Sequence, residues 1–170
     1  MDGARFMKPV LELDVGYTAK IATPFAVIGV ITRAEKVTRL QYLPTGAASL
    51  LPIDTLSREV SQQIKAFVAD CQFKFDLPCE VLGTDFQRRV WAQISSIALG
   101  SVLSYGEIAK RIPSAARAVG NCCGANRLSL IIPCHRVVGA CGIGGFMHTR
   151  SEGDALRIKR WLLRHEGALQ

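Results

Sequence analysis

Pro113 is the residue that most limits how the second half of the chain can fold, because it ends a helix soon after that helix has begun. Ser104 and Glu107 form a capping box at its start, and proline cannot continue a helix because it lacks an amide hydrogen. Ser114 can then cap a second helix, rich in small residues, over residues 115–124. Two short helices joined by so tight a turn predict a helix-turn-helix whose second member is the recognition helix. Plain packing of one helix on the other would explain the pattern equally well.

The charge of the chain is concentrated in the same half. Residues 1–80 hold nine basic and nine acidic side chains, whereas residues 81–170 hold twelve basic and five acidic ones, so the whole formal charge of +7 lies there. Such an asymmetry predicts a polyanionic partner, and nucleic acid is the commonest. A basic surface that serves only solubility is the alternative.

The first half has the pattern of a small sheet followed by a helix. Between residues 10 and 43 the sequence alternates and is rich in Val, Ile, Thr and Tyr, which predicts a meander of about three strands. Asp54 can cap a helix whose apolar residues recur at spacings of three and four. We therefore expect an α/β N-terminal domain over residues 1–80 and a mostly helical C-terminal domain over residues 81–170.

The second half contains further regular segments. Thr84 and Gln87 form a capping box for a helix that ends at Gly100. Residues 128–132 are apolar and predict a short buried strand, and a glycine-rich loop follows over residues 139–145. A last amphipathic helix has an apolar stripe of Leu156, Ile158, Trp161, Leu162 and Leu163.

The sequence argues against several classes of protein. No apolar run approaches the roughly 18 residues of a membrane span, and the N-terminus has no apolar core of a secretory signal, so we expect a cytoplasmic protein. The cysteines include no C-x-x-C pair and no histidine at zinc-finger spacing, so we expect reduced thiols, no metal and no cofactor. They are Cys71, Cys79, Cys122, Cys123, Cys134 and Cys141.

Cys134 is the candidate nucleophile. It follows Pro133 where the predicted buried strand ends, and His135 and Arg136 come directly after it. The thiolate is the reactive form of cysteine, and an imidazole or a cation nearby lowers the pKa of the thiol. Adjacent residues of a strand point to opposite faces, so direct contact between the imidazole and the thiol is not assured, and a water could bridge them. An inert buried cysteine is the alternative.

In combination, these motifs resemble the O6-alkylguanine-DNA alkyltransferase family, the methylated-DNA–protein-cysteine methyltransferases. The resemblance covers residues 84–166 and implies a winged-helix-like domain with a helix-turn-helix there, preceded by an RNase-H-like domain. It rests on Ser104-Tyr105-Gly106-Glu107, Ala116-Arg117-Ala118-Val119-Gly120, Asn126, Ile132-Pro133-Cys134-His135-Arg136-Val137 and the final Lys159-Arg160-Trp161-Leu162-Leu163-Arg164-His165-Glu166.

The resemblance implies direct-reversal DNA repair. Cys134 would take a methyl or larger alkyl group from the O6 atom of guanine in one irreversible transfer, so each molecule acts once. His135 would act on Cys134 through a water, and Glu166 would hold the imidazole in the right tautomer. No cofactor is implied, and a monomer acting on double-stranded DNA is expected.

The resemblance also implies binding in the minor groove and rotation of the damaged base out of the duplex. Arg117 would replace the extruded guanine in the stack, and Tyr105 would crowd the target phosphate. Asn126 would brace the turn after the recognition helix, and Val137 would offer backbone groups to the guanine edge. Further candidates for substrate or DNA contacts are Arg127, where many members have proline, Arg136, Phe146 in place of a family tyrosine, and Ser151.

The loop over residues 139–153 is longer than the family's by several residues. Its five glycines predict a mobile lid over the alkyl pocket, because an ordered glycine-rich loop costs conformational entropy; a solvated loop remote from the pocket is the alternative. Two other functions stay open. One is a non-catalytic protein that binds alkylated DNA, although such relatives have tryptophan in place of Cys134. The other is a helix-turn-helix transcription regulator with an incidental thiol.

Overall fold

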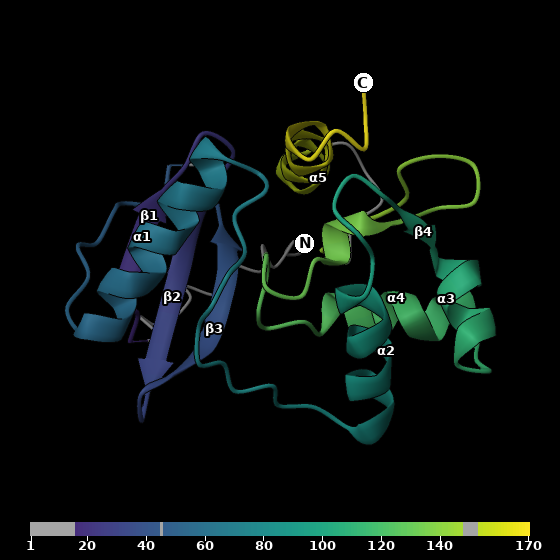
Figure 1. Ribbon diagram of the computed structural model, residues 1–170, viewed down its shortest axis with the longest axis horizontal. Coiled ribbons are helices and arrows are strands. Elements are labelled where there is room, and N and C mark those ends of the chain that lie inside the picture. Colours follow the sequence, from purple (N-terminus) through teal and green to yellow (C-terminus); the bar gives the residue numbers. More distant parts are fainter. Residues whose placement is uncertain (1–15, 45, 148–152) are drawn as a thin grey trace, which may run out of the picture.

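The structure, a computed structural model, describes residues 16–44, 46–147 and 153–170. Figure 1 shows a sheet covered by one helix on one side of the molecule, a group of helices on the other, and the last helix beside the junction between them. Small β-plus-α and helical parts were both expected. Among the described residues, no helix is long and apolar enough to cross a membrane.

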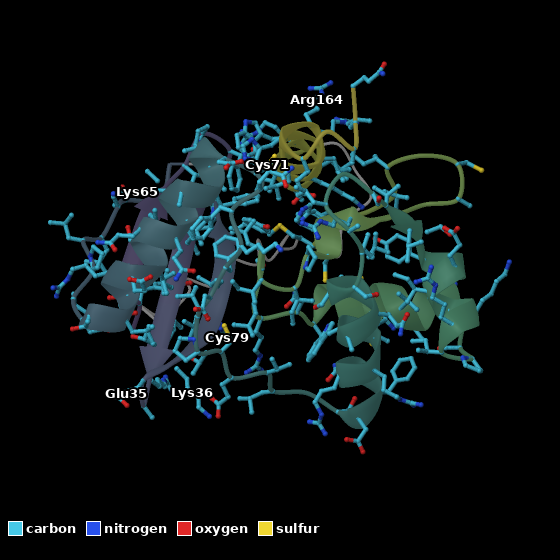
Figure 2. The ribbon with its side chains drawn as sticks, in the orientation of Figure 1. Glu35, Lys36, Lys65, Cys71, Cys79 and Arg164 are labelled. Carbon is cyan, nitrogen blue, oxygen red and sulfur yellow. The ribbon has the colours of Figure 1, made fainter. Side chains whose placement is uncertain are left out.

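The first part is an antiparallel sheet with one helix packed on it. The strands are β1 (Ala19–Ala22), β2 (Val27–Arg33) and β3 (Lys36–Leu43), in the spatial order β1-β2-β3, and the helix is α1 (Thr55–Ala69). Figure 2 shows Glu35 and Lys36 at the tip of the β2–β3 hairpin. Ala34 and Glu35 both have positive φ, 46° and 58°, as a two-residue hairpin turn requires. The predicted three-strand meander is confirmed over the described residues.

Asp54 caps α1 as predicted. Its carboxylate accepts a hydrogen bond from the Ser57 amide at 2.7 Å, which satisfies one of the free donors of the first turn. The helix then buries Val60, Ile64 and Phe67, which share one face because they recur at spacings of four and three. That face lies on the sheet and forms the core of the first part.

The described residues of the second part form four α-helices and a small parallel sheet. Its elements are α2 (Asp85–Ser95), β4 (Leu103–Ser104), α3 (Tyr105–Arg111), α4 (Ala116–Gly124), the 3-10 helix η1 (Cys134–Arg136), β5 (Val137–Val138) and α5 (Asp154–His165). The capping boxes at Thr84 and Ser104 both form, and α3 ends just before Pro113, all as predicted. Strand β4 pairs with β5, which places the start of α3 beside the end of η1.

Three local predictions were wrong. Helix α2 ends at Ser95, before the predicted end at Gly100. Ser114 does not cap α4: the N-cap position is Ala115, and the Ser114 amide instead donates to the Ala109 carbonyl at 2.9 Å. Residues 128–132 do not form a strand. Only Leu128 bridges to β3, and the Ile132 amide turns back to the Leu128 carbonyl at 2.9 Å, so the segment coils and delivers the chain into η1.

Backbone and ring contacts join the two parts. The Leu40 amide in β3 donates to the Arg127 carbonyl at 2.8 Å, and the Ser129 amide donates back to the Leu40 carbonyl at 3.0 Å. On the α5 side, the Phe25 and Trp161 rings stack with centroids 4.5 Å apart. The edge of the first sheet therefore lies against the segment that precedes Cys134.

Candidate active site

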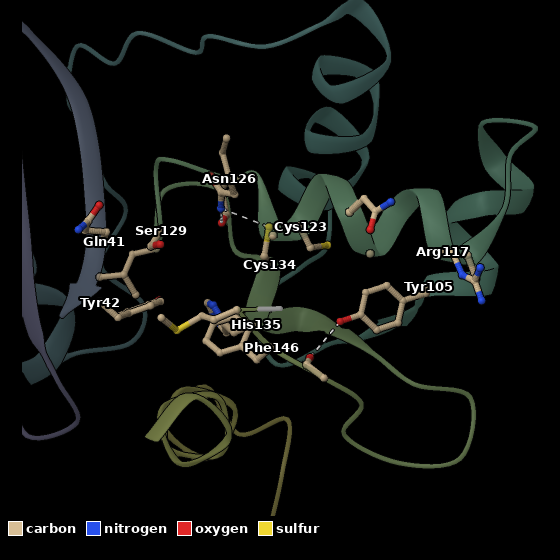
Figure 3. Close-up of a pocket in the computed structure, with 18 residues that line it drawn as sticks. Gln41, Tyr42, Tyr105, Arg117, Cys123, Asn126, Ser129, Cys134, His135 and Phe146 are labelled. Carbon is tan, nitrogen blue, oxygen red and sulfur yellow. Dashed lines mark hydrogen bonds between the residues drawn. The ribbon is translucent and has the colours of Figure 1, made fainter. Parts of the chain in front are cut away.

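A cavity of about 610 Å³ lies where β3, α4, η1 and the loop after β5 meet. Figure 3 shows Gln41 and Tyr42 at one end, Arg117 at the other and Cys134 between them. The cavity is therefore open to solvent beside α4, on the basic half of the chain, and is closed at its far end by the first part of the molecule.

Cys134 is buried, with only 6% of its surface exposed, and it opens the 3-10 helix η1. Its Sγ accepts a hydrogen bond from Asn126 Nδ2 at 3.2 Å. A hydrogen bond with the Cys123 thiol, together with burial, raises the pKa of Cys134 well above the usual cysteine value. Asn126 and the ammonium of Lys159 act in the opposite direction. The resting thiol therefore keeps its proton and needs a base to become a nucleophile.

Asn126 braces the turn between α4 and Cys134, as the resemblance implied. Its Nδ2 also donates to the Ile132 carbonyl at 2.9 Å, and its Oδ1 accepts from the Leu128 amide at 2.9 Å. The Asn126 side chain, just after α4, thus hydrogen bonds to both ends of the coiled segment and to the Cys134 sulfur. The position of the Cys134 thiol follows from these bonds.

His135 and Glu166 lie in contact, as expected. His135 Nε2 is 2.9 Å from Glu166 Oε1, and both residues are buried. Burial lowers the pKa of His135 despite the neighbouring carboxylate, so the imidazole is neutral. Burial works against ionisation of Glu166, but hydrogen bonds from His135 and Arg136 lower its pKa to about 2. Since the carboxylate can only accept, the imidazole proton is on Nε2 and the Nδ1 atom is the free base.

Arg136 lies behind this pair instead of facing DNA, where the sequence analysis had assigned it. Its Nε and Nη2 donate to the two Glu166 oxygens at 2.9 and 3.0 Å, and its Nη1 donates to the Ile97 carbonyl at 2.8 Å. A guanidinium suits this place because it can hold both carboxylate oxygens at once. Arg136 therefore orients Glu166, and through it His135.

Lys159 is the functional candidate that sequence reasoning missed. It is fully buried, and its Nζ donates to the Val137 carbonyl at 2.6 Å and to the Gly145 carbonyl at 2.9 Å. Burial lowers its pKa to about 8, against the attraction of the nearby thiols. One signal in the sequence could have identified it. Lys159 follows Leu156 by three residues and precedes Leu163 by four, so it lies on the buried face of α5. Burial of a lysine ammonium in such an apolar stripe costs free energy unless the ammonium is hydrogen bonded or paired.

Tyr105 and Arg117 lie at the open end of the cavity. The Tyr105 hydroxyl donates to the Gly145 carbonyl at 3.0 Å, the same oxygen that Lys159 holds. Phe146 follows and forms a buried wall of the cavity. The loop is therefore held at Gly145; residues 148–152 of the predicted mobile lid lie outside the described residues. Arg117 is exposed on α4 beside Tyr105 (Figure 3).

Two further candidates, Arg127 and Val137, do not line the cavity. Arg127 is exposed on the coiled segment, Val137 is buried and gives its carbonyl to Lys159, and Ser151 lies outside the described residues. The cavity lining also includes residues that were not predicted as site residues, among them Gln41, Tyr42, Cys123 and Ser129. No group of three or more metal-ligating side chains occurs in the described part of the chain.

Comparisons with known proteins agree with this geometry. The sequence profile described as "6-O-methylguanine DNA methyltransferase, DNA binding domain" matches residues 85–168. The methylated-DNA–protein-cysteine methyltransferase of Methanosarcina acetivorans is 41% identical over 114 residues, which are 65% of this chain and 69% of that protein. The corresponding protein of Saccharomyces cerevisiae is 55% identical over 67 residues, 38% of this chain, but the match spans only 36% of the yeast protein.

Two solved structures extend the similarity to the first part of the chain. The O6-methylguanine methyltransferase of Mycobacterium tuberculosis has a TM-score of 0.73 at 32% identity and covers 89% of this chain and 92% of its own. A crystal structure of Mycobacterium tuberculosis OGT in complex with DNA has a TM-score of 0.72 at 34% identity, covering 88% and 91%. The similarity in fold therefore includes the sheet and α1.

Proposed function

Because this chain belongs to the 6-O-methylguanine DNA methyltransferase family, we propose that it repairs alkylated DNA by direct reversal. The alkyl group passes from O6 of guanine to Sγ of Cys134: the carbon–oxygen bond breaks and a carbon–sulfur bond forms, while guanine keeps the electron pair and takes up the proton that the thiol gives up, so that guanine departs neutral. The product is a stable thioether, so each molecule acts once. The observation that carries this proposal is a cysteine fixed by Asn126 beside a buried His135–Glu166 pair in an open cavity.

The arrangement suits a thiol that ionises only when it is needed. Cys134 keeps its proton at rest because the contact with Cys123 and its burial raise its pKa. Neutral His135, with Nδ1 unprotonated, can remove that proton through a water, and ionised Glu166 stabilises the imidazolium that forms. The ammonium of Lys159 then favours the thiolate.

For DNA, we propose that α3 and α4 act as a helix-turn-helix in the minor groove and that the damaged nucleotide rotates into the cavity. The charge distribution and the small residues of α4 support this proposal. Arg117 would fill the gap in the base stack, with Tyr105 beside the extruded nucleotide. Arg127, exposed next to α4, would contact phosphate.

We propose that the finer fold classes hold as well. The strand meander with α1 supports an RNase-H-like domain over residues 1–80, and β4–β5 beside α3 and α4 supports a winged-helix-like domain over residues 81–170. Since the cavity takes residues from both domains of a single chain, we propose that the protein works as a monomer.

Mass spectrometry after incubation with duplex DNA that carries O6-methylguanine tests the proposed reaction. The protein should gain one methyl group, on Cys134, with no metal or cofactor added. Cys134→Ser should still bind the DNA but gain nothing. Methylation of Cys123 or Cys141 in place of Cys134 would refute the assignment, and binding by the unaltered protein without any transfer would favour the non-catalytic alternative.

A second experiment tests base rotation. Arg117→Ala should slow transfer from duplex DNA by about tenfold or more, because a stacked replacement for the guanine is lost, while transfer from free O6-methylguanine base should change far less. Rates with the two substrates, measured in parallel, provide the comparison. Equal losses with both would indicate a damaged pocket and would contradict a role in rotation.

A further inference from the structure

Cys123 is a second thiol inside the same cavity, and the reaction proposed above does not use it. It lies in the last turn of α4, whereas Cys134 opens η1. Figure 3 shows both side chains on the cavity wall, with the Asn126 amide beside the Cys134 sulfur. Both thiols line the cavity, and the Cys123 thiol raises the pKa of the Cys134 thiol, as a close neighbour does.

The backbone around the two cysteines is fixed by short-range contacts. Asn126, three residues after Cys123, holds both the Ile132 carbonyl and the Cys134 sulfur. The Asn126 amide donates to the Cys123 carbonyl at 3.2 Å, which completes the turn at the end of α4. The two thiols are therefore neighbours because the turn is braced, and a bond between them would close only a short loop.

The surroundings of this pair give an oxidant access and partly offset the burial that raises the pKa of Cys134. The buried Lys159 ammonium interacts with both thiols, and a neighbouring cation promotes the thiolate that attacks peroxide. The cavity admits small oxidants because it is open to solvent. Cys122 precedes Cys123 on the same helix but is buried on another face, where its carbonyl accepts from Trp91 Nε1 at 2.8 Å.

We propose that Cys123 and Cys134 form a reversible disulfide, with Cys123 as the resolving thiol that protects the alkyl acceptor from irreversible oxidation. In the first step the Cys134 thiolate attacks hydrogen peroxide; the O–O bond breaks, hydroxide leaves, and Cys134 becomes a sulfenic acid. In the second step the Cys123 thiolate attacks that sulfur, the S–S bond forms and a second hydroxide leaves. Both hydroxides take up the thiol protons, so two thiols and one peroxide yield one disulfide and two waters.

The role of the resolving thiol follows from the oxidation chemistry of cysteine. A sulfenic acid without a partner thiol is oxidised further to a sulfinic acid, which ordinary thiols do not reduce, whereas a disulfide is reduced by dithiols. Because the acceptor works only once per molecule, each Cys134 lost to oxidation removes one repair event. This inference rests on the proposed function only in taking Cys134 as the acceptor; the disulfide itself can be measured without any transfer.

The experiment treats the full chain with hydrogen peroxide and measures two quantities separately. Peptide mass spectrometry without reductant should show a Cys123–Cys134 linked peptide whose mass is lower by two hydrogen atoms. Methyl transfer from O6-methylguanine DNA should be lost on oxidation and restored by dithiothreitol. In Cys123→Ser, Cys134 should instead gain two oxygen atoms, and dithiothreitol should restore less than about a tenth of the transfer capacity.

Cys122→Ser is the matched control, since it removes the adjacent thiol on the same helix turn. It should form the linked peptide and recover transfer as the unaltered protein does. Protein whose Cys134 is already methylated should form no disulfide at this site. Equal recovery in Cys123→Ser and the unaltered protein, or a linked peptide that joins Cys134 to another cysteine, would overturn the proposal. If the unoxidised protein failed to accept a methyl group, the proposed function would be contradicted. The linked peptide would still show whether the disulfide forms, because it is measured without any transfer.

Discussion

The two parts of this molecule contribute differently to one cavity. The second part supplies the thiol, the His135–Glu166 pair, the buried Lys159 and the whole net positive charge. The first part has no net formal charge over residues 1–80, and of its described residues only Gln41 and Tyr42 line the cavity, as a wall. The family profile matches the second part alone, while the structural similarity extends over both. Side chains that form the cavity wall need only the right shape, whereas the transfer reaction needs particular residues at particular distances from the Cys134 thiol.

Tyr42 illustrates how the first part provides that shape. Its ring packs against Phe146 and Phe25 with centroid distances of 5.8 and 6.2 Å, and Phe25 in turn stacks on Trp161 of α5. Burial, and then the nearby Cys134 and Glu166, raise the pKa of the Tyr42 hydroxyl, so it stays neutral. Three aromatic contacts therefore position a residue that cannot serve as a base. The comparison predicts that substitutions in the second part affect reaction rate more than substitutions at this wall.

The largest effect is expected for Glu166→Gln. The amide cannot provide a negative charge to His135 and Arg136 together, so methyl transfer should fall by about a hundredfold or more. The pKa of this carboxyl is about 2 in the folded chain against the ordinary 4.5. A lowered pKa stabilises the folded state above pH 4.5, and the contribution of about 3 kcal/mol is lost as the pH falls from 4.5 towards 2.

Urea unfolding at a series of pH values from neutral down to 3 measures that contribution. The unaltered protein should lose stability on acidification more steeply than Glu166→Gln, and the two curves should approach each other at the acidic end. Glu35→Gln, at an exposed carboxyl on the tip of the β2–β3 hairpin, serves as the control. If the free energies of unfolding of the unaltered protein and of Glu166→Gln changed in parallel with pH, ionised Glu166 would not stabilise the folded state.

A smaller effect is expected for Lys159→Met, which removes the ammonium that holds Val137 and Gly145. Transfer should fall by about tenfold, because the loop wall and the charge beside Cys134 are both lost. The folded-state pKa is about 8 against the ordinary 10.5, so the folded chain binds fewer protons than the unfolded chain between these values. The stability of the unaltered protein relative to Lys159→Met should therefore rise, by about 3 kcal/mol, as the pH increases from 8 to 10.5.

Denaturant unfolding of both proteins between pH 7 and 10.5 checks this sign. Lys65→Met, an exposed substitution on α1, should change neither transfer nor the pH dependence. If the stability of the unaltered protein relative to Lys159→Met fell as the pH rose, Lys159 would be stabilised in its charged form, contrary to what its burial implies.

The smallest effect is expected at the wall. Tyr42→Phe keeps the ring that packs on Phe146 and removes only a hydroxyl with no hydrogen-bond partner among the described residues, so methyl transfer should change by less than about twofold. Single-turnover rates with methylated duplex DNA provide the measurement, and Thr38→Val on the same strand is the control for losing a hydroxyl from β3. A tenfold loss of methyl transfer in Tyr42→Phe, without such a loss in Thr38→Val, would show that Tyr42 takes part in the reaction and does not only form the cavity wall.

Local signals explain why much of the fold and part of the site could be predicted. The capping boxes at Thr84 and Ser104 and the stop at Pro113 act within a few residues, and each appears in the structure as expected. The turn at Ala34 and Glu35 is equally local. The motif around Cys134 identified the thiol and the histidine beside it, and the resemblance suggested Glu166 as their partner.

The remaining features depend on contacts between distant residues. Whether residues 128–132 become a strand depends on how β3 and Asn126 hold them, and they coil instead. The guanidinium of Arg136 turns inward because Glu166, 30 residues later, lies there. The sequence by itself determined the helices, the charged half and the reactive thiol, because periodicity, capping and motif spacing are properties of neighbouring residues. Only the tertiary structure decided that Tyr42, Cys123 and Lys159 meet that thiol, because burial and contact across the chain exist only once it has folded.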